Sequence, residues 1–196
     1  MKITKTTTLL LLLCLALNSK SFAQENETKT VKPLKLLIGG ALEFGGDEIA
    51  EVYFTNGETQ SVKAGQGGAI AIGAQLQVPK VEKLLLRATV GYKYVTTQAD
   101  NVHIRLTRIP IHVTANYMVA KKLRLGGGLA MHQNIKFKSD GIGPDLRFDA
   151  ASGPIFEIAY SGIGLSYTAM KYKDQEKNTY SANAIGVTFS LTIPGK

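Results

Sequence analysis

Apolar and polar residues alternate along most of the chain beyond residue 34. In residues 106–117, Ile109 and Val113 belong to an apolar set of alternate positions, whereas Arg108 and His112 belong to a polar set. Successive side chains of a β-strand point to opposite faces, so this pattern predicts a strand with one apolar and one polar face.

Seven further segments show the same alternation. The eight predicted strands are residues 36–44, 68–78, 84–95, 106–117, 123–134, 153–160, 163–172 and 182–193. Each has roughly the 9 to 11 residues that a tilted strand needs to cross the hydrocarbon layer of a membrane.

The connections between these segments alternate in length. Short connections are predicted at residues 79–83, 120–122 and 161–162, and long ones at residues 45–67, 96–105, 137–152 and 173–181. Short turns at one rim and long loops at the other, with both termini at the short-turn rim, are typical of an antiparallel up-and-down barrel of the outer membrane.

Alternation alone leaves open which face meets lipid, because a soluble sandwich or a ligand-carrying barrel has its apolar face inside. The residue types favour the membrane arrangement, since the polar face carries both signs of charge and many small residues. Aromatic residues gather near the two ends of the apolar face, as two membrane interfaces select. They are Phe44, Tyr92, Tyr94 and Tyr172 toward the long loops, and Tyr117 and Tyr160 next to the short turns.

The interior of an eight-stranded barrel is just wide enough to be filled by side chains. We therefore expect a plugged, ion-paired interior without an open pore, because unpaired charges there would be costly to desolvate. Glu43 is expected to pair with Arg108 or Arg124. The predicted interior polar network comprises Glu43, Arg87, Arg108, His112, Arg124, His132 and Glu157.

The N-terminal segment predicts a secretory signal peptide. Lys2 and Lys5 precede an apolar run at residues 9–17, and small residues two apart lead to a cleavage site after Ala23. The apolar run is far shorter than the roughly 20 residues of a membrane-spanning helix. Export across the inner membrane of a Gram-negative cell envelope, with removal of the signal, is the predicted fate.

The mature chain is then divided into a periplasmic lead at residues 24–33 and a barrel domain at residues 34–196. The only cysteine, Cys14, leaves with the signal peptide, which excludes disulfides, thiolate metal sites and cysteine nucleophiles. The formal net charge of +8 falls to +5 when three lysines leave with the signal. For an exported protein, phospholipid and lipopolysaccharide phosphates are nearer partners of this basic excess than nucleic acid.

Three histidines allow hydrolytic chemistry to be checked. His112 and His132 project toward the predicted interior, where Glu157 or Glu43 could orient them. Membership of an internal hydrogen-bond network is the simpler interpretation. His103 is expected in a solvated loop.

Other chemical motifs are missing from the sequence. There is no His-x-Ser motif of a lipid A deacylase, no metal-ligand spacing and no phosphate-binding loop followed by Lys-Ser/Thr. We therefore expect no catalytic residue, no metal and no cofactor.

The first long loop is predicted to contain an ordered hairpin. Residues 49–55 and 59–63 flank Asn56-Gly57, a strong signal for a two-residue turn. Two further barrel strands remain the alternative, although these segments are short and polar. As an exposed edge, the hairpin is a candidate site for a protein partner, with Tyr53 and Phe54 as possible anchors.

The signal peptide, the eight alternating strands and the last strand together resemble the small outer-membrane β-barrel superfamily, which includes the membrane domain of the outer-membrane protein A family. In that group, the assembly machinery of outer-membrane barrels reads a glycine and two alternating hydrophobic residues in the last strand. Gly186, Phe189 and Leu191 fit these positions. The chain departs from the pattern at its end, where Pro194-Gly195-Lys196 replaces the usual terminal aromatic residue.

The predicted fold is all-β, an eight-stranded antiparallel up-and-down transmembrane barrel in the outer membrane. The predicted function is non-enzymatic, either structural or in surface interaction through the extracellular loops. An exported soluble barrel that carries an apolar ligand, or a lipid-modifying outer-membrane enzyme, is the alternative.

Overall fold

The computed structural model describes residues 33–53, 59–99, 102–141 and 143–193. Every regular element in these ranges is a β-strand. The predicted signal peptide and all of the predicted lead except Pro33 lie outside the described residues. Within those ranges, no helix is long and apolar enough to cross a membrane.

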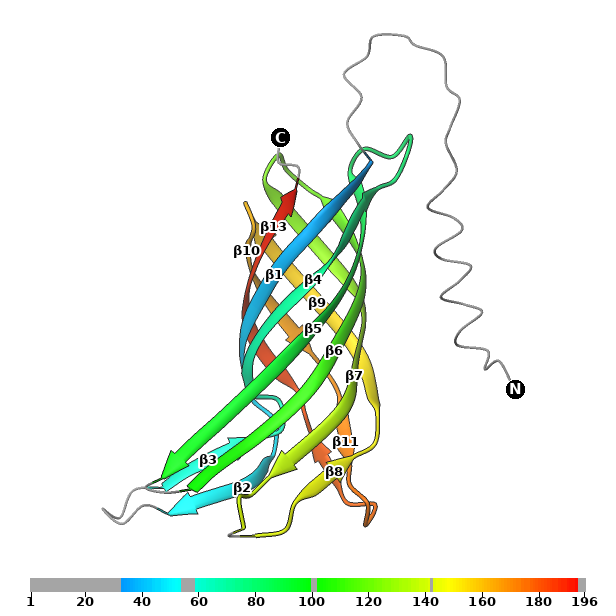
Figure 1. Cartoon of the computed structure of the whole chain (residues 1–196). Coiled ribbons are helices and arrows are strands. Elements are labelled where there is room, and N and C mark those ends of the chain that lie inside the picture. The colour runs from blue at the N-terminus through cyan, green and yellow to red at the C-terminus, as the bar shows by residue number, and fades with distance from the viewer. Residues whose placement is uncertain (1–32, 54–58, 100–101, 142, 194–196) are drawn as a thin grey trace, which may run out of the picture. The chain divides into compact units, whose positions relative to one another are not determined.

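Eight long strands form a closed antiparallel barrel (Figure 1). Neighbours along the chain are neighbours in the sheet, and the barrel closes where Leu36 of the first strand pairs with Ile193 of the last. The predicted eight-stranded up-and-down architecture is therefore confirmed. The strands are β1 (Leu34–Phe44), β4 (Gly67–Gln77), β5 (Leu84–Ala99), β6 (Val102–Met118), β7 (Leu123–Lys138), β9 (Ala151–Tyr160), β10 (Ile163–Thr168) and β13 (Ala184–Ile193).

Five shorter strands lie in the long connections. They are β2 (Glu48–Tyr53), β3 (Thr59–Lys63), β8 (Leu146–Phe148), β11 (Lys171–Lys173) and β12 (Thr179–Ser181). The β2–β3 and β11–β12 pairs are separate two-stranded sheets, and β8 pairs with β7. The first long loop thus contains a hairpin and adds no strand to the barrel.

The outer surface of the barrel is apolar around its whole circumference. Ile70 on β4, Phe156 on β9 and Leu191 on β13 are 70%, 57% and 63% exposed. A protein surrounded by water rarely exposes so large a continuous apolar band, whereas a barrel in lipid requires one. The apolar face therefore points outward, and the barrel is a transmembrane barrel.

Near the long-loop end, the strands continue further than predicted. β5 and β6 pair as far as Ala99 and Val102, so the long loop predicted at residues 96–105 is wrong. His103 accordingly lies in β6 rather than in a loop, with an exposed side chain. The strands can continue because Ile104 and Leu106 bury their side chains inside this part of the barrel.

The interior of the long-loop end is an apolar core. Its buried side chains come from β3, β6, β7, β8 and β11 and include Val62, Ile104, Leu106, Ile135, Phe137, Phe148 and Tyr172. Polar residues such as Arg105 and Lys138 point outward here. This is the pattern of a barrel in water, so the strands leave the apolar surroundings within their own length.

A β-bulge at Asn134 lets β7 turn its apolar residues from the outer face to the interior at the long-loop end. The register with β6 shifts between Thr107 and Ile109, and Asn134 has a positive φ of 51°. Asparagine tolerates this left-handed conformation better than most residues. Alternation along the predicted strand 123–134 puts Asn134 on the polar, inward set with Arg124 and His132, and this is wrong, because the extra residue turns Asn134 outward and turns Ile135 inward.

Tyr172 was also predicted on the wrong face. It is fully buried, not part of an aromatic girdle. Buried and exposed residues alternate from Ile163 to Lys173, so Tyr172 falls on the same inward set as Ser166 and Thr168. The other predicted girdle residues are exposed: Phe44, Tyr92, Tyr94, Tyr117 and Tyr160.

Candidate functional site

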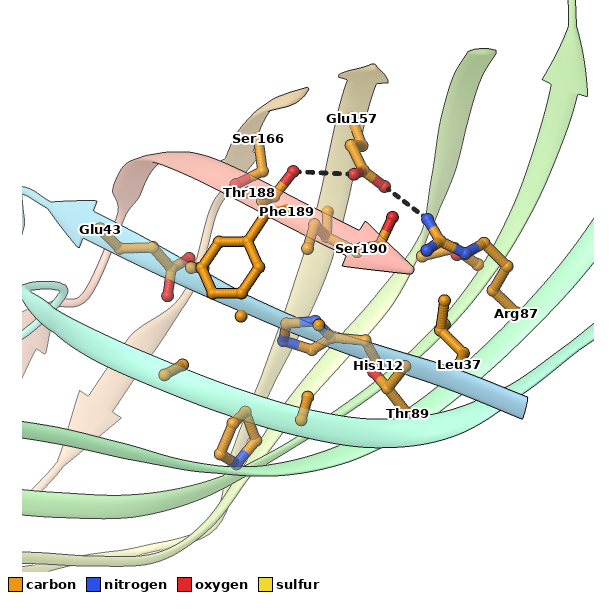
Figure 2. Close-up of a pocket in the computed structure, with 18 residues that line it drawn as sticks. Leu37, Glu43, Arg87, Thr89, His112, Glu157, Ser166, Thr188, Phe189 and Ser190 are labelled. Atoms are coloured by element: carbon orange, nitrogen blue, oxygen red, sulfur yellow. Dashed lines mark hydrogen bonds and ion pairs between the residues drawn. The ribbon is translucent and has the colours of Figure 1, made fainter. Parts of the chain in front are cut away.

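The barrel interior contains a cavity of about 100 Å³, drawn in Figure 2. Its walls come from β1, β4, β5, β6, β9, β10 and β13. Small residues leave the space, since Gly39 and Ala41 on β1 face Ala69 and Ala71 on β4. Charged groups lie at both ends of this cavity.

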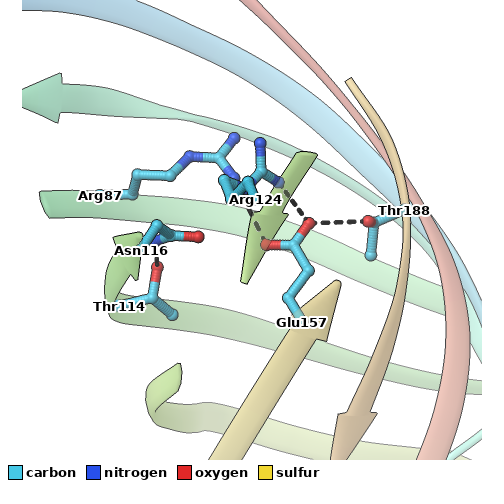
Figure 3. Close-up of polar contacts among 6 residues, drawn as sticks. All are labelled: Arg87, Thr114, Asn116, Arg124, Glu157 and Thr188. Carbon is cyan, nitrogen blue, oxygen red and sulfur yellow. Dashed lines mark hydrogen bonds and ion pairs between the residues drawn. The ribbon is translucent and has the colours of Figure 1, made fainter. Parts of the chain in front are cut away.

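The charged group nearer the short turns is centred on Glu157 (Figure 3). Glu157 Oε1 accepts hydrogen bonds from Arg124 Nη2 at 2.6 Å and Thr188 Oγ1 at 2.9 Å. Arg87 Nη1 approaches the second oxygen, Oε2, at 3.4 Å. One carboxylate thus holds two buried cations from β5 and β7, and a hydroxyl from β13.

Asn116 packs beside this group. Its Nδ2 atom donates to Thr114 Oγ1 at 2.8 Å. A side chain at Gly126 on the neighbouring strand would place its Cβ 2.3 Å from Asn116 Oδ1, so only glycine lets the amide approach β7 this closely. Gly126 is therefore required by the close packing of Asn116 against β7.

The second charged group lies nearer the long loops. Lys93 Nζ contacts Glu43 Oε2 at 2.5 Å and donates to the Gly65 carbonyl at 2.7 Å. Arg108 Nη2 donates to the Gln66 carbonyl. Both carbonyls belong to the segment between β3 and β4, so these cations also secure the base of the first long loop.

The expected pairing of Glu43 with Arg108 or Arg124 is wrong, because Glu43 pairs with Lys93. Arg124 lies at the start of β7, beside the short turn, and reaches Glu157 instead. Lys93 is 1% exposed and was not included in the predicted network. Its position in the alternation of β5 placed it on the interior face, but alternation gives no partner.

The two interior histidines lie side by side, and one of them, His132, contacts Tyr172 of the apolar core. Their ring centroids are 6.4 Å apart. His132 Nδ1 is 2.5 Å from the Tyr172 hydroxyl, and this contact crosses from β7 to β11. Burial raises the pKa of Tyr172 to about 12, so the hydroxyl keeps its proton at neutral pH.

The structure thus brings together all seven residues of the predicted interior network inside one barrel, in two groups with the histidines between them. The recorded partner of His132 is Tyr172 and not a glutamate. In the described ranges, no cluster of three or more metal-ligating side chains occurs. Absence of catalysis, metal and cofactor stays a prediction.

The predicted anchors in the first long loop cannot be placed. Phe54 lies outside the described residues, and only the backbone of Tyr53 is described, at the end of β2. The hairpin itself is ordered by pairing of β2 with β3 and by a 2.5 Å hydrogen bond from Ser61 Oγ to Glu48 Oε2. Tyr53 and Phe54 as interaction residues remain a prediction.

The outer surface at the long-loop end carries a basic belt, which we define as Arg105, Lys136, Lys138 and Arg147. The register places Arg105 opposite Lys138, and Lys136 opposite Arg147, on the adjacent strands β6, β7 and β8. Thr107, the next outward position after Arg105, pairs with Tyr94 of the aromatic girdle. The belt therefore lies directly beyond the apolar band.

Comparison with solved structures found small barrels of outer membranes. Ail, the attachment invasion locus protein of Yersinia pestis, was solved alone and with the heparin analogue sucrose octasulfate. In the latter structure it is 8% identical, with a TM-score of 0.42 over 81% of this chain and 97% of Ail. Neisserial surface protein A is 12% identical, with a TM-score of 0.45 over 81% of this chain and 96% of that protein.

The closed order of eight strands decides the class. This chain has the architecture of a small outer-membrane barrel. No protein-family model and no curated protein matches the sequence. At such low identity the solved barrels show the fold alone.

The turn between β11 and β12 gives a prediction about pH. Asp174 accepts hydrogen bonds from the Glu176 and Asn178 amides, both at 2.9 Å, and from Asn178 Nδ2 at 3.0 Å. Desolvation raises the pKa of Asp174, but these bonds and one from Tyr180 together lower it below its ordinary value. The turn is thus stabilised above the ordinary aspartate pKa, and this contribution is lost as the pH falls through the lowered value.

We expect the amide chemical shifts of Glu176 and Asn178 to titrate together, with an inflection below the ordinary aspartate pKa. NMR spectra recorded across the acid range in uncharged detergent would measure it. Asp174→Asn is the matched control and should abolish the inflection that the two amides share. An inflection at or above the ordinary value would contradict the prediction.

Proposed function

We propose that this chain is a non-enzymatic outer-membrane barrel with a plugged polar interior, which presents a rigid extracellular surface to anionic glycolipid. The proposed partners of the protein are the phosphates of lipopolysaccharide and phospholipid and, during insertion, the barrel assembly machinery. The observation that carries it is the basic belt directly beyond the apolar band.

The position of the belt supports contact with lipid phosphates. Four cations on three adjacent strands point outward, next to the level at which the aromatic girdle ends. The three ion pairs described above, Arg87–Glu157, Arg124–Glu157 and Lys93–Glu43, lie inside the barrel. Outward cations near an anionic membrane surface contribute about 1 kcal/mol each to binding.

The charged interior supports a structural role over ligand transport. A carrier for an apolar molecule would line its cavity with apolar side chains throughout, whereas this cavity is bordered by the charged side chains of Glu43, Arg87 and Glu157 as well as by Leu37 and Ile155. Apolar ligands cannot replace the lost hydration of such groups. The apolar core at the long-loop end is filled by its own side chains, which supports a stiff platform for the loops.

The test compares two matched triple variants. Arg105→Gln/Lys138→Gln/Arg147→Gln removes three belt cations, and Lys83→Gln/Lys121→Gln/Lys122→Gln removes three exposed cations at the short-turn end. The protein, expressed with its full chain and purified from membranes in uncharged detergent, is titrated with lipopolysaccharide. We expect the belt variant to bind on the order of a hundredfold more weakly, since about 1 kcal/mol is lost per cation.

The control variant should bind like the native protein, and dephosphorylated lipopolysaccharide should bind all three proteins equally weakly. Equal weakening of both variants would show that net charge, rather than the belt, attracts the glycolipid. Native-like binding by the belt variant would overturn the proposal.

A further inference from the structure

The apolar outer surface of the barrel is hollowed over β1 and β4, which lie side by side in Figure 1. A groove of about 620 Å³ opens there toward the surroundings of the barrel. This volume is within the roughly 300–1,000 Å³ of sites that hold organic ligands. The outward residues that line the groove come from four adjacent strands and are Leu42, Gly68, Ile70, Tyr92, Tyr94 and Phe189.

Gly68 forms the floor of this groove, which we call the Gly68 groove. The register places Gly68 between Leu42 on β1 and Tyr94 on β5. A Cβ atom added at Gly68 would meet only the Leu42 side chain within 4 Å, at 3.5 Å, so the space above the glycine is open. At Gly40, by contrast, the Phe189 ring occupies that space. The groove therefore exists because a side chain is missing between two large ones.

One wall of the Gly68 groove is aromatic. The rings of Tyr92 and Tyr94 are stacked, with centroids 6.5 Å apart and an angle of 18° between their planes. Aromatic side chains have few rotatable bonds, so they offer a large contact surface at a low cost in conformational entropy. The wall is thus suited to hold an apolar group that packs along it.

The Gly68 groove lies next to the basic belt. Tyr94, in its wall, lies opposite Thr107 of β6, and Thr107 lies opposite Lys136 of β7. Arg105 is the next outward residue of β6 toward the long loops. Adjacent strands are about 4.8 Å apart, so two to three strand spacings, about 10–14 Å, separate the groove from these cations.

We propose that the Gly68 groove holds one acyl chain of the anionic glycolipid whose phosphates bind the basic belt. This inference rests on the proposed function and adds to it a site for the hydrocarbon part of the lipid. The groove opens within the apolar band, where a polar occupant would leave its own hydrogen-bonding groups without partners. Cations beside an open apolar groove match a molecule with phosphates at one end and acyl chains at the other.

The charge of the belt favours a glycolipid over a phospholipid as the occupant. The belt has four cations on three adjacent strands. A single phosphodiester would neutralise one of them, whereas a lipid with several phosphates can contact more than one. The same lipid is then recognised twice, by its charge at the belt and by the packing of its chain in the groove.

The test uses variants of the full-chain product in uncharged detergent. Gly68→Leu fills the groove, and the backbone tolerates a side chain there because φ at Gly68 is not positive. Gly127→Leu is the matched control, since it adds the same side chain at another outward glycine, on β7. A Cβ atom added at Gly127 also meets nothing closer than 3.6 Å.

Titration with lipopolysaccharide should show about tenfold weaker binding by Gly68→Leu, because about a dozen atom–atom contacts with the chain are lost. Gly127→Leu should bind like native protein. Deacylated lipopolysaccharide that keeps its phosphates contacts only the belt, so it should bind native protein and Gly68→Leu equally. Equal lipopolysaccharide binding by Gly68→Leu and native protein would overturn the inference.

The belt variant Arg105→Gln/Lys138→Gln/Arg147→Gln separates this inference from the proposed function. If the belt variant binds lipopolysaccharide weakly and Gly68→Leu binds it like native protein, only the inference about the groove is wrong. If the belt variant binds like native protein, the proposed function is wrong and the inference that rests on it is wrong too.

A second measurement uses native protein in nanodiscs of chain-deuterated phospholipid with one protonated lipopolysaccharide molecule per barrel. Nuclear Overhauser effects from the acyl-chain protons should reach the Leu42 methyl groups and the Tyr94 ring, and should be much weaker at Leu165, an exposed residue of β10. Equal effects at Leu42 and Leu165 would show that lipid chains contact the barrel without preference. Self-association of native protein that Gly68→Leu abolishes would assign the groove to a second copy of the chain. Either result overturns the proposal.

Discussion

Replacement of Glu157 by alanine is expected to destabilise the barrel by about 3–5 kcal/mol, the cost of removing one partner from a buried ion pair. The variant leaves Arg87 and Arg124 facing each other across the barrel interior without their shared carboxylate. It also leaves the Thr188 hydroxyl without its acceptor. Such a loss is a large part of the total stability of an ordinary domain.

Urea unfolding in uncharged detergent measures this loss. A second readout is the temperature at which heating in detergent unfolds the barrel and thereby changes its mobility in gel electrophoresis. Glu82→Ala, at an exposed position in a short turn, is the control and should change stability by less than about 0.5 kcal/mol. Glu157→Gln keeps the shape and one acceptor but removes the charge, so it should lie between the two. If Glu157→Ala unfolds like Glu82→Ala, the group around Glu157 contributes little to stability.

The inward and outward faces of the strands could be predicted because side chains of a β-strand alternate between its two faces, so one assigned residue fixes the direction of its neighbours. Once Ile109 and Val113 are assigned to lipid, Arg108 and His112 must point inward, and the structure places them there. Closure followed from the alternation of short and long connections. Both inferences depend on local backbone geometry, which is why single-sequence reasoning could reach them.

Ion-pair partners could not be predicted in the same way. Alternation places Lys93, Arg108 and Arg124 on the interior face but gives no height along the barrel axis. That height depends on the stagger between strands, which brings Arg124 to Glu157 and Lys93 to Glu43. Several long side chains compete for each carboxylate, so partner choice is a property of the assembled barrel.

The sequence nevertheless indicates where the membrane-spanning part of the barrel ends. From Ile109 onward, the outward apolar residues of β6 have odd sequence numbers. Before Ile109, the apolar residues Ile104 and Leu106 have even sequence numbers. The backbone continues without a bulge on this strand, so the change reflects new surroundings of the barrel: lipid on one side of the boundary and water on the other. The loop predicted at residues 96–105 is wrong because the strands continue through this reversal and pair as far as Ala99 and Val102.

The strand β7 reaches the same boundary by a different route. Its bulge at Asn134 shifts the register by one residue and so brings Ile135 and Phe137 inward. A single asparagine is a weak signal of a left-handed residue, because asparagine is equally common in turns and on polar faces. The bulge could therefore be recognised only with the paired strand in place.

Replacement of Tyr172 by alanine is expected to open the long-loop end of the barrel while the membrane-spanning strands stay folded. Tyr172 is fully buried, and its ring contacts Phe148 at a centroid distance of 5.7 Å. Truncation of a large aromatic side chain in a core costs about 3–5 kcal/mol, and His132 also loses its partner. Because the apolar core lies beyond the membrane band, this cost falls on local opening rather than on global unfolding.

Hydrogen exchange of the β11 and β12 amides should therefore accelerate strongly in Tyr172→Ala, while the heat-dependent gel shift of the whole barrel changes little. Tyr172→Phe is the matched control: it keeps the ring and loses only the hydroxyl contact, which costs about 1–3 kcal/mol if His132 is left without a partner. Exchange rates that rise from native protein to Tyr172→Phe and again to Tyr172→Ala support an apolar core that folds as a unit at the base of the loops. Exchange in Tyr172→Ala at the native rate, or parallel loss of the gel shift, would show that the core and the membrane-spanning strands are not separate cooperative units.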